Sequence, residues 1–198
     1  MWSLLFATGY LTSSENSAGN MVELKIPNNE VRDIFSDFIL ELFEEKVAED
    51  GEAVTEFCTA LKDGDVADVE RLFTKFISKT ISIRDTAVRK EFKENFYHGL
   101  ILGILFFKHD WDVSSNRESG DGYYNIAIEI EDEGIGIIIE VKYAEDECYE
   151  DACTEAMDQI NKTGYTEELK EDGMWKILKY GVACYRKQCR VVLERENI

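Results

Sequence analysis

The sequence predicts an α/β fold, and two observations support this class. Apolar residues before Phe107 recur with the one-sided spacing of amphipathic helices, whereas after Phe107 their period changes to that of strands. From Asp85 onward the segments then follow one another in the order α, β, β, β, α, β. That order is typical of an α/β core and not of a helical bundle or a β-sandwich.

The composition is that of one globular domain with a small helical annex. The chain has 198 residues, of which 44% are hydrophobic and 32% charged. Its longest apolar stretches, such as Leu100–Phe107, run far short of the ~18 residues of a membrane span. The apolar amino terminus has no cationic residue ahead of it, so we do not expect a secretion signal. Five cysteines, an odd number, suit a reducing compartment, and we expect a cytoplasmic protein without membrane contact.

The charge of the chain is strongly segregated. The formal net charge is −19, which on average repels a polyanion such as nucleic acid. Residues 71–109, however, hold 8 basic and 3 acidic side chains, and residues 174–198 hold 6 and 2. A local basic face is therefore compatible with the sequence, although the same counts also describe an ordinary solvated helix surface.

The amino-terminal part divides into two predicted segments. Residues 1–30 are expected to form a connector, in which Val22–Ile26 alternates like a short strand. Residues 31–84 are expected to form a helical subdomain. Its first helix begins at Val31, and two further helices follow, the second of which Asp65 is placed to cap.

Residues 85–198 make up the predicted core. A long helix is expected from about Asp85, as its N-cap, to Phe107. The residues Glu131–Gly134 predict a turn between two strands. The expected elements after the helix are strands over Trp111–Arg117, Tyr123–Glu131 and Ile135–Lys142, a helix over Asp146–Lys162, and strands over Ile177–Tyr185 and Cys189–Leu193.

Basic side chains gather on one face of the helix before the core. Arg71, Lys75 and Lys79 recur every four residues, so they share a face away from most of the apolar positions. A nucleic-acid backbone could lie along this face. Lys187, in the final predicted turn, is a further candidate for a phosphate contact, although a solvated turn lysine is the simpler interpretation.

The strongest chemical signal lies in Ile137–Lys142. Common nucleotide-binding loops are excluded, because no Gly-rich turn ends in Gly-Lys-Ser/Thr and no Gly-x-Gly-x-x-Gly follows a strand. In Ile137–Lys142 an apolar run leads into Glu140 and Lys142, two positions that share one face of a strand. The carboxylate can hold a divalent cation, and the lysine can orient or help to deprotonate an attacking water. A plain structural ion pair is the alternative.

Around this pair the chain resembles a known family. The stretches that carry the resemblance are Asn95–Leu100, Ser115–Ile126, Glu140–Lys142, Gln159–Ile160 and Tyr165. They are similar to the motifs of the PD-(D/E)XK nuclease superfamily. The chain looks most like the nuclease-like domain at the carboxyl end of microbial proteins whose amino-terminal part is an ATPase-like domain. This resemblance implies a restriction-endonuclease-like core, a central mixed sheet flanked by helices. The ATPase-like part is missing here, so a separate ATPase is an expected protein partner.

The resemblance also implies roles for individual residues. Glu140 becomes the carboxylate of the metal site, and Lys142 becomes the lysine of the active site. Glu94 matches the acid of the first helix, and Gln159 matches a glutamine that faces the site from the following helix. Mg²⁺ or Mn²⁺ is the implied cofactor.

One position departs from the family pattern. Asn125 stands where the group carries its metal-binding aspartate, and Tyr123 replaces an arginine. Asparagine offers a carbonyl oxygen to Mg²⁺ but no charge, so a cation should bind less tightly. Asp121, in the preceding loop, and Glu129, on the same strand face, are the alternatives for the missing carboxylate.

The function implied by this resemblance is metal-dependent phosphodiester hydrolysis of nucleic acid, weakened or lost through Asn125. The alternative is a catalytically inactive nuclease-fold module that binds nucleic acid or protein, for instance as a regulatory partner of a separate ATPase.

Histidine and cysteine leave two further questions open. His98 is either a hydrogen-bonded helix residue or a contact to the scissile phosphate. Two pairs of cysteines are either small buried thiols or ligands of a zinc or iron–sulfur site. These pairs are Cys148 with Cys153 and Cys184 with Cys189.

Overall fold

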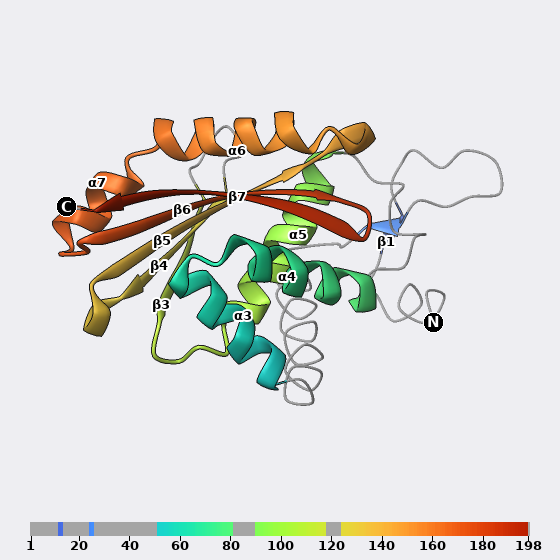
Figure 1. Cartoon of the computed structure of the whole chain (residues 1–198). Helices are drawn as coiled ribbons and strands as arrows, with labels where there is room; N and C mark the ends of the chain where they lie inside the picture. The colour runs from blue at the N-terminus through green and yellow to red at the C-terminus, as the bar shows by residue number, and fades with distance from the viewer. Residues whose placement is uncertain (1–11, 14–23, 26–50, 81–89, 118–123, 198) are drawn as a thin grey trace. The chain divides into compact units, whose positions relative to one another are not determined.

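Two compact units make up the chain, Met1–Glu49 and Asp50–Ile198. The computed structural model describes residues 12–13, 24–25, 51–80, 90–117 and 124–197 (Figure 1). In the first unit, β1 (Thr12–Ser13) pairs antiparallel with β2 (Leu24–Lys25), which lies within the predicted short strand. The predicted helix from Val31 and the predicted segment boundaries near residues 30 and 84 lie outside the described residues.

The second unit is built on a five-stranded mixed sheet in the order β3-β4-β5-β6-β7. Only β5 and β6 run parallel among these neighbours, and the other three pairs are antiparallel. The strands are β3 (Asp112–Arg117), β4 (Tyr124–Ile130), β5 (Ile135–Tyr143), β6 (Lys176–Tyr185) and β7 (Gln188–Asn197). The fold is therefore the restriction-endonuclease-like α/β core that the sequence predicts.

The predicted turn between β4 and β5 is present. A short 3₁₀ turn, Glu131–Glu133, ends at Gly134, whose φ of 60° is left-handed. The indole of Trp175 covers this glycine so closely that a Cβ would lie 2.2 Å from Nε1. Glycine is required here by both its backbone angle and the contact, because any side chain would meet the ring.

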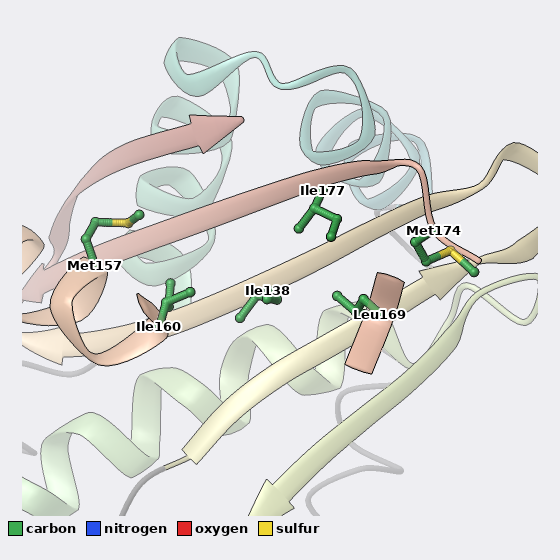
Figure 2. Packing of buried hydrophobic residues seen from close by; sticks show 6 residues of the cluster. All are labelled: Ile138, Met157, Ile160, Leu169, Met174 and Ile177. Atoms are coloured by element: carbon green, nitrogen blue, oxygen red, sulfur yellow. The ribbon is translucent and has the colours of Figure 1, made fainter. Parts of the chain in front are cut away.

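One face of the sheet is covered by α6 (Tyr149–Lys162) and α7 (Tyr165–Glu171). Figure 2 shows the apolar cluster that joins them to β5 and β6. Its members are Ile138, Met157, Ile160, Leu169, Met174 and Ile177. The helix predicted from about Asp146 to Lys162 is present and ends at Lys162, but it begins at Tyr149. Asp146 (φ 53°) and Glu147 (φ 66°) adopt left-handed angles that delay its start.

The opposite face is covered by α3 (Gly51–Asp63), α4 (Val66–Thr80) and α5 (Lys90–Leu105). Asp65 caps α4 as predicted, since its Oδ1 accepts the Asp68 N–H at 3.1 Å. The buried hydroxyl of Tyr180 in β6 donates to the Leu61 carbonyl at 2.7 Å, which ties the end of α3 to the sheet. Among the helices in the described ranges, none is long and apolar enough to cross a bilayer.

α4 also lies against the edge strand β7. The Glu70 carboxylate accepts the Val191 N–H at 3.1 Å, and the Thr74 hydroxyl accepts the Cys189 N–H at 3.4 Å. Arg190 adds an ion pair to Glu70. Side chains of α4 thus take the place of a sixth strand for these two backbone donors.

Candidate active site

Glu140 and Lys142 form a buried ion pair between β5 and α6. They lie on the same face of β5 as Ile138, which packs against α6. Lys142 Nζ lies 3.1 Å from Glu140 Oε1, and Lys142 is only 7% exposed and Glu140 only 2%. Glu155 of α6 approaches the same ammonium at 3.9 Å. Two carboxylates from different elements therefore converge on one lysine.

The second oxygen of Glu140 is the unusual atom of this group. Glu140 Oε2 is buried and has no hydrogen-bond partner among the described residues. Burial raises the pKa of Glu140 from 4.5 to about 7, against the opposing effect of Lys142, and Glu94 and Glu155 raise it further. The carboxyl group is thus poised to lose its proton near neutral pH, or earlier when a cation takes the proton's place.

Gln159 is brought to the same interface by α6. It lies one turn after Glu155 and is 7% exposed, and its Nε2 has no hydrogen-bond partner in the described part of the chain. The helix lies close to the sheet because β6 carries Gly181 in register with Glu140. A Cβ on Gly181 would approach the Cys153 carbonyl of α6 to 3.1 Å.

Glu94 of α5 reaches the carboxyl end of β5. Its Oε1 accepts the Tyr143 N–H at 3.1 Å, one residue after Lys142. This contact places the carboxylate near enough to influence the Glu140 pKa. The structure therefore brings Glu94, Glu140 and Lys142 together, and the chain positions of these residues alone do not require this.

Asn125 of β4 lies directly opposite Glu140 in the antiparallel register, which also pairs it with Asn116 of β3. Glu129 is instead paired with Gly136, four residues away along both strands. Four residues of strand span roughly 13 Å. Glu129 is therefore too distant to replace a ligand beside Glu140, while Asp121 and Tyr123 lie outside the described residues.

A sequence model described as the PD-(D/E)XK nuclease superfamily matches residues 92–194, just over half of the chain. The chain belongs to this superfamily. The match begins in α5 and ends in β7, so it spans all five residues proposed for the site. No curated protein and no solved structure matches the chain.

PD-(D/E)XK nucleases generally use divalent metals, and the residues here fit such a cation in part. The buried, unpartnered Oε2 of Glu140 is the hard oxygen ligand that Mg²⁺ or Mn²⁺ prefers. No group of three or more histidine, cysteine, aspartate or glutamate side chains within the described ranges is arranged to hold a metal. A cation would therefore rest on Glu140, with a neutral ligand such as Asn125 and water completing its shell.

Glu155 is the residue of this superfamily site that the sequence does not single out. Its proximity to Lys142 depends on how α6 crosses β5, and no local pattern encodes that crossing. The sequence does contain one indication of this residue, because Glu155 precedes Gln159 by four positions and so shares its helix face.

His98 contacts β3. It is an 8% exposed residue of α5, and its Nε2 lies 3.3 Å from the Ser115 hydroxyl of β3. Burial lowers the pKa of His98 from 6.5 to about 4, so the imidazole is neutral at physiological pH. This supports the interpretation as a hydrogen-bonded helix residue.

The four candidate phosphate contacts lie on or beside α4. Arg71, Lys75 and Lys79 are exposed on this helix, as their spacing predicts, and Arg71 pairs with Asp68 at 2.8 Å. Lys187, from the turn between β6 and β7, donates to the Ser78 carbonyl at 3.2 Å. Lys187 thus joins the last turn of α4, although more than one hundred residues separate them in the sequence.

All five cysteines are free thiols. Cys184 and Cys189 face each other across the β6–β7 ladder, and Cys153 donates toward the carbonyls of Gly181 and Arg190. Burial raises the pKa of Cys153 and of both hairpin thiols. They behave as small buried side chains, whereas Cys148 is exposed.

Proposed function

We propose that the protein is a metal-dependent nuclease that hydrolyses phosphodiester bonds of nucleic acid with a weakened metal site. The observation that carries this proposal is the buried Glu140–Lys142 pair, in which one carboxylate oxygen contacts the lysine and the other has no partner. A purely structural ion pair would satisfy both oxygens, since an unpaired buried acceptor is costly.

Each residue of the pair has a distinct task. Glu140 would hold Mg²⁺ or Mn²⁺ through Oε2, and the cation when bound supplies Lewis acidity toward the scissile phosphate. Lys142 would orient the attacking water and offset charge that develops on the phosphate. Gln159 would hold groups in the site through hydrogen bonds of its buried amide. The Glu94 carboxylate would add negative electrostatic potential around Glu140.

Asn125 would determine how tightly the site holds a divalent cation. Its register position opposite Glu140 is where a second ligand is needed. A neutral carbonyl oxygen there would hold a divalent cation less tightly than a carboxylate. Arg71, Lys75, Lys79 and Lys187 would contact backbone phosphates and so offset the acidic net charge of the chain locally.

A cleavage assay with three proteins tests the proposal. Labelled DNA and RNA are incubated with Mn²⁺ or Mg²⁺ and the natural protein, Glu140→Ala or Asn125→Asp, and Mn²⁺ binding is followed by calorimetry. We expect cleavage by the natural protein, none by Glu140→Ala, and tighter Mn²⁺ binding by Asn125→Asp. Cleavage that persists in Glu140→Ala would refute the assignment.

A second candidate function is a nuclease fold that binds without cleaving. The absence of a three-ligand cluster among the described residues favours it, as does the asparagine opposite Glu140. Silence of the natural protein together with cleavage by Asn125→Asp would identify this case. Co-purification with a separate ATPase would then support a regulatory role, and recovery of the protein without an ATPase would count against that role.

A further inference from the structure

Aromatic rings form a continuous series at the carboxyl end of β5. Phe96 and Tyr97 of α5 meet edge to face with centroids 5.5 Å apart, and Tyr97 stacks on Tyr143 at 6.4 Å. Tyr143 in turn contacts Tyr185, at the end of β6, at 5.6 Å. The series therefore connects α5 to the β6–β7 turn, and it passes through Tyr143, the residue that directly follows Lys142.

The two outer rings of the series reach solvent. Tyr97 and Tyr143, the two inner rings, are buried, with exposed fractions of 3% and 4%, and the outer rings pack on them. Phe96 is 44% exposed, and Tyr185 is half-buried. An exposed phenylalanine costs free energy in water unless another surface covers it.

Cations accompany these rings. Lys93 Nζ lies 4.3 Å from the centroid of Tyr143, and the Arg186 guanidinium lies 5.0 Å from that of Tyr185. Lys187 follows Arg186 and contacts the end of α4. We call Phe96, Tyr185, Lys93, Arg186 and Lys187 the aromatic–cation surface.

The backbone of Arg186 is held in a costly conformation. Arg186 has φ of 50°, which is left-handed and uncommon for a residue with a long side chain. The buried Tyr97 hydroxyl donates to the Arg186 carbonyl at 2.8 Å and fixes the turn. A two-residue hairpin loop between Tyr185 and Gln188 requires a positive φ of this kind, so the turn holds Arg186 in a defined conformation.

Charge differs between the two sides of this end of the sheet. On the α6 side, Glu145, Asp146 and Glu147 are exposed directly after β5. Lys93 belongs to α5 and Lys187 contacts α4, whereas Tyr185 also packs against the buried cluster beside α6. Figure 1 shows the β6–β7 turn and the end of α4 at the same end of the sheet. A polyanion at this end of the sheet is therefore repelled by the acidic residues after β5 and attracted by Lys93, Arg186 and Lys187.

From these contacts we propose that the aromatic–cation surface binds single-stranded nucleic acid at the carboxyl end of β5, the strand that carries the Glu140–Lys142 pair. The proposal rests on the proposed function for its substrate class and adds a preference for unpaired strands. Phe96 and Tyr185 offer ring faces on which unpaired bases stack, while Lys93, Arg186 and Lys187 contact the backbone. Bases inside a duplex are already stacked and paired, so they cannot use these rings.

Binding without metal tests the proposal separately from cleavage. Fluorescein-labelled oligothymidylate, and its duplex with oligoadenylate, are titrated with the full chain in EDTA by fluorescence anisotropy. The variants are Phe96→Ala and Arg186→Asn, since asparagine tolerates the left-handed turn without charge. The matched controls are Phe106→Ala and Lys62→Gln. Phe106 is 58% exposed and follows the carboxyl end of α5, and Lys62 pairs with Glu133 in the turn before β5.

We expect tighter binding of the single strand than of the duplex. Phe96→Ala should weaken single-strand binding by about fivefold or more, the loss of one stacked base. Arg186→Asn should lower the slope of log K against log salt by about 0.7, the value for one phosphate contact on a single strand. Both controls should bind as the natural protein does.

Three results would overturn the proposal: equal or tighter duplex binding, no effect of Phe96→Ala, or no binding to either oligonucleotide. Thermal unfolding of each variant shows that a loss of binding is not a loss of fold. Cleavage with an ineffective Phe96→Ala would leave the proposed function standing without this surface. Binding through Phe96 in a protein that never cleaves would leave the surface standing without the reaction.

Discussion

Lys142 Nζ lies 3.1 Å from Glu140 Oε1, inside an interface where neither residue is more than 7% exposed. A buried pair of this kind contributes little to stability, because the cost of removing two charges from water offsets their attraction. The same desolvation makes Glu140 sensitive to pH.

The first prediction concerns Glu140 and pH. The folded-state pKa of about 7 lies above the ordinary 4.5, so this group favours folding at low pH and that contribution is lost as pH rises from 4.5 to 7. Glu140→Gln should therefore gain stability relative to the natural protein over this window, by roughly 3 kcal/mol. Urea unfolding at several pH values measures the difference, and a difference that does not change with pH would contradict the shift.

His98 should show the opposite sign. Its folded-state pKa of about 4 lies below 6.5, so the neutral imidazole favours folding above pH 6.5 and that contribution is lost as pH falls toward 4. His98→Gln should therefore gain stability relative to the natural protein on acidification, by roughly 3 kcal/mol. The two groups partly cancel in the natural protein. Only the separate variants reveal them, and slopes of the same sign would exclude this account.

Gln159 should be replaceable without loss of stability but with loss of function. Its Nε2 is buried and unpartnered, so Gln159→Met removes an unsatisfied donor and should leave the free energy of unfolding unchanged or raise it by about 1 kcal/mol. Cleavage should fall. Thr166→Val is the matched control, because Thr166 Oγ1 is also buried and unpartnered but lies on α7. A destabilised Gln159→Met would show that the amide makes a structural bond.

Gly181 should control how closely α6 approaches the sheet. A Cβ there would lie 2.9 Å from Val192 Cγ2 and 3.1 Å from the Cys153 carbonyl. Gly181→Ala should cost about 1–3 kcal/mol by overpacking and should reduce cleavage, since Glu140 lies opposite in the register. Adding Val192→Ala should recover part of the stability. A single variant as stable as the natural protein would mean that α6 moves freely.

Much of the fold follows from local patterns in the sequence. The change of apolar period after Phe107 predicts the strands, Gly134 predicts the turn before β5, and Asp65 predicts the start of α4. α7 is not predicted, because it has seven residues and buries only Thr166 and Leu169, too few to show a helical period. Features that depend on tertiary packing, such as the approach of α6 to the sheet, leave no such local trace.

The candidate site likewise combines features that the sequence predicts with features that depend on tertiary packing. The shared face of Glu140 and Lys142 follows from strand geometry alone. The approach of Glu155 and the ring series from Phe96 to Tyr185 depend on how separate elements pack against one another. Sequence therefore identifies the chemical pair, and only the structure shows what surrounds it.

Thr74 and Glu70 accept hydrogen bonds from the Cys189 and Val191 N–H groups of the edge strand, and this affects self-association. A sheet grows by recruiting a neighbour's strand through unmatched amide and carbonyl groups at its border. Along this stretch of β7 those amides are already occupied, so a second molecule cannot add there without first displacing α4. Strand addition along this stretch of β7 is therefore disfavoured by the helix itself.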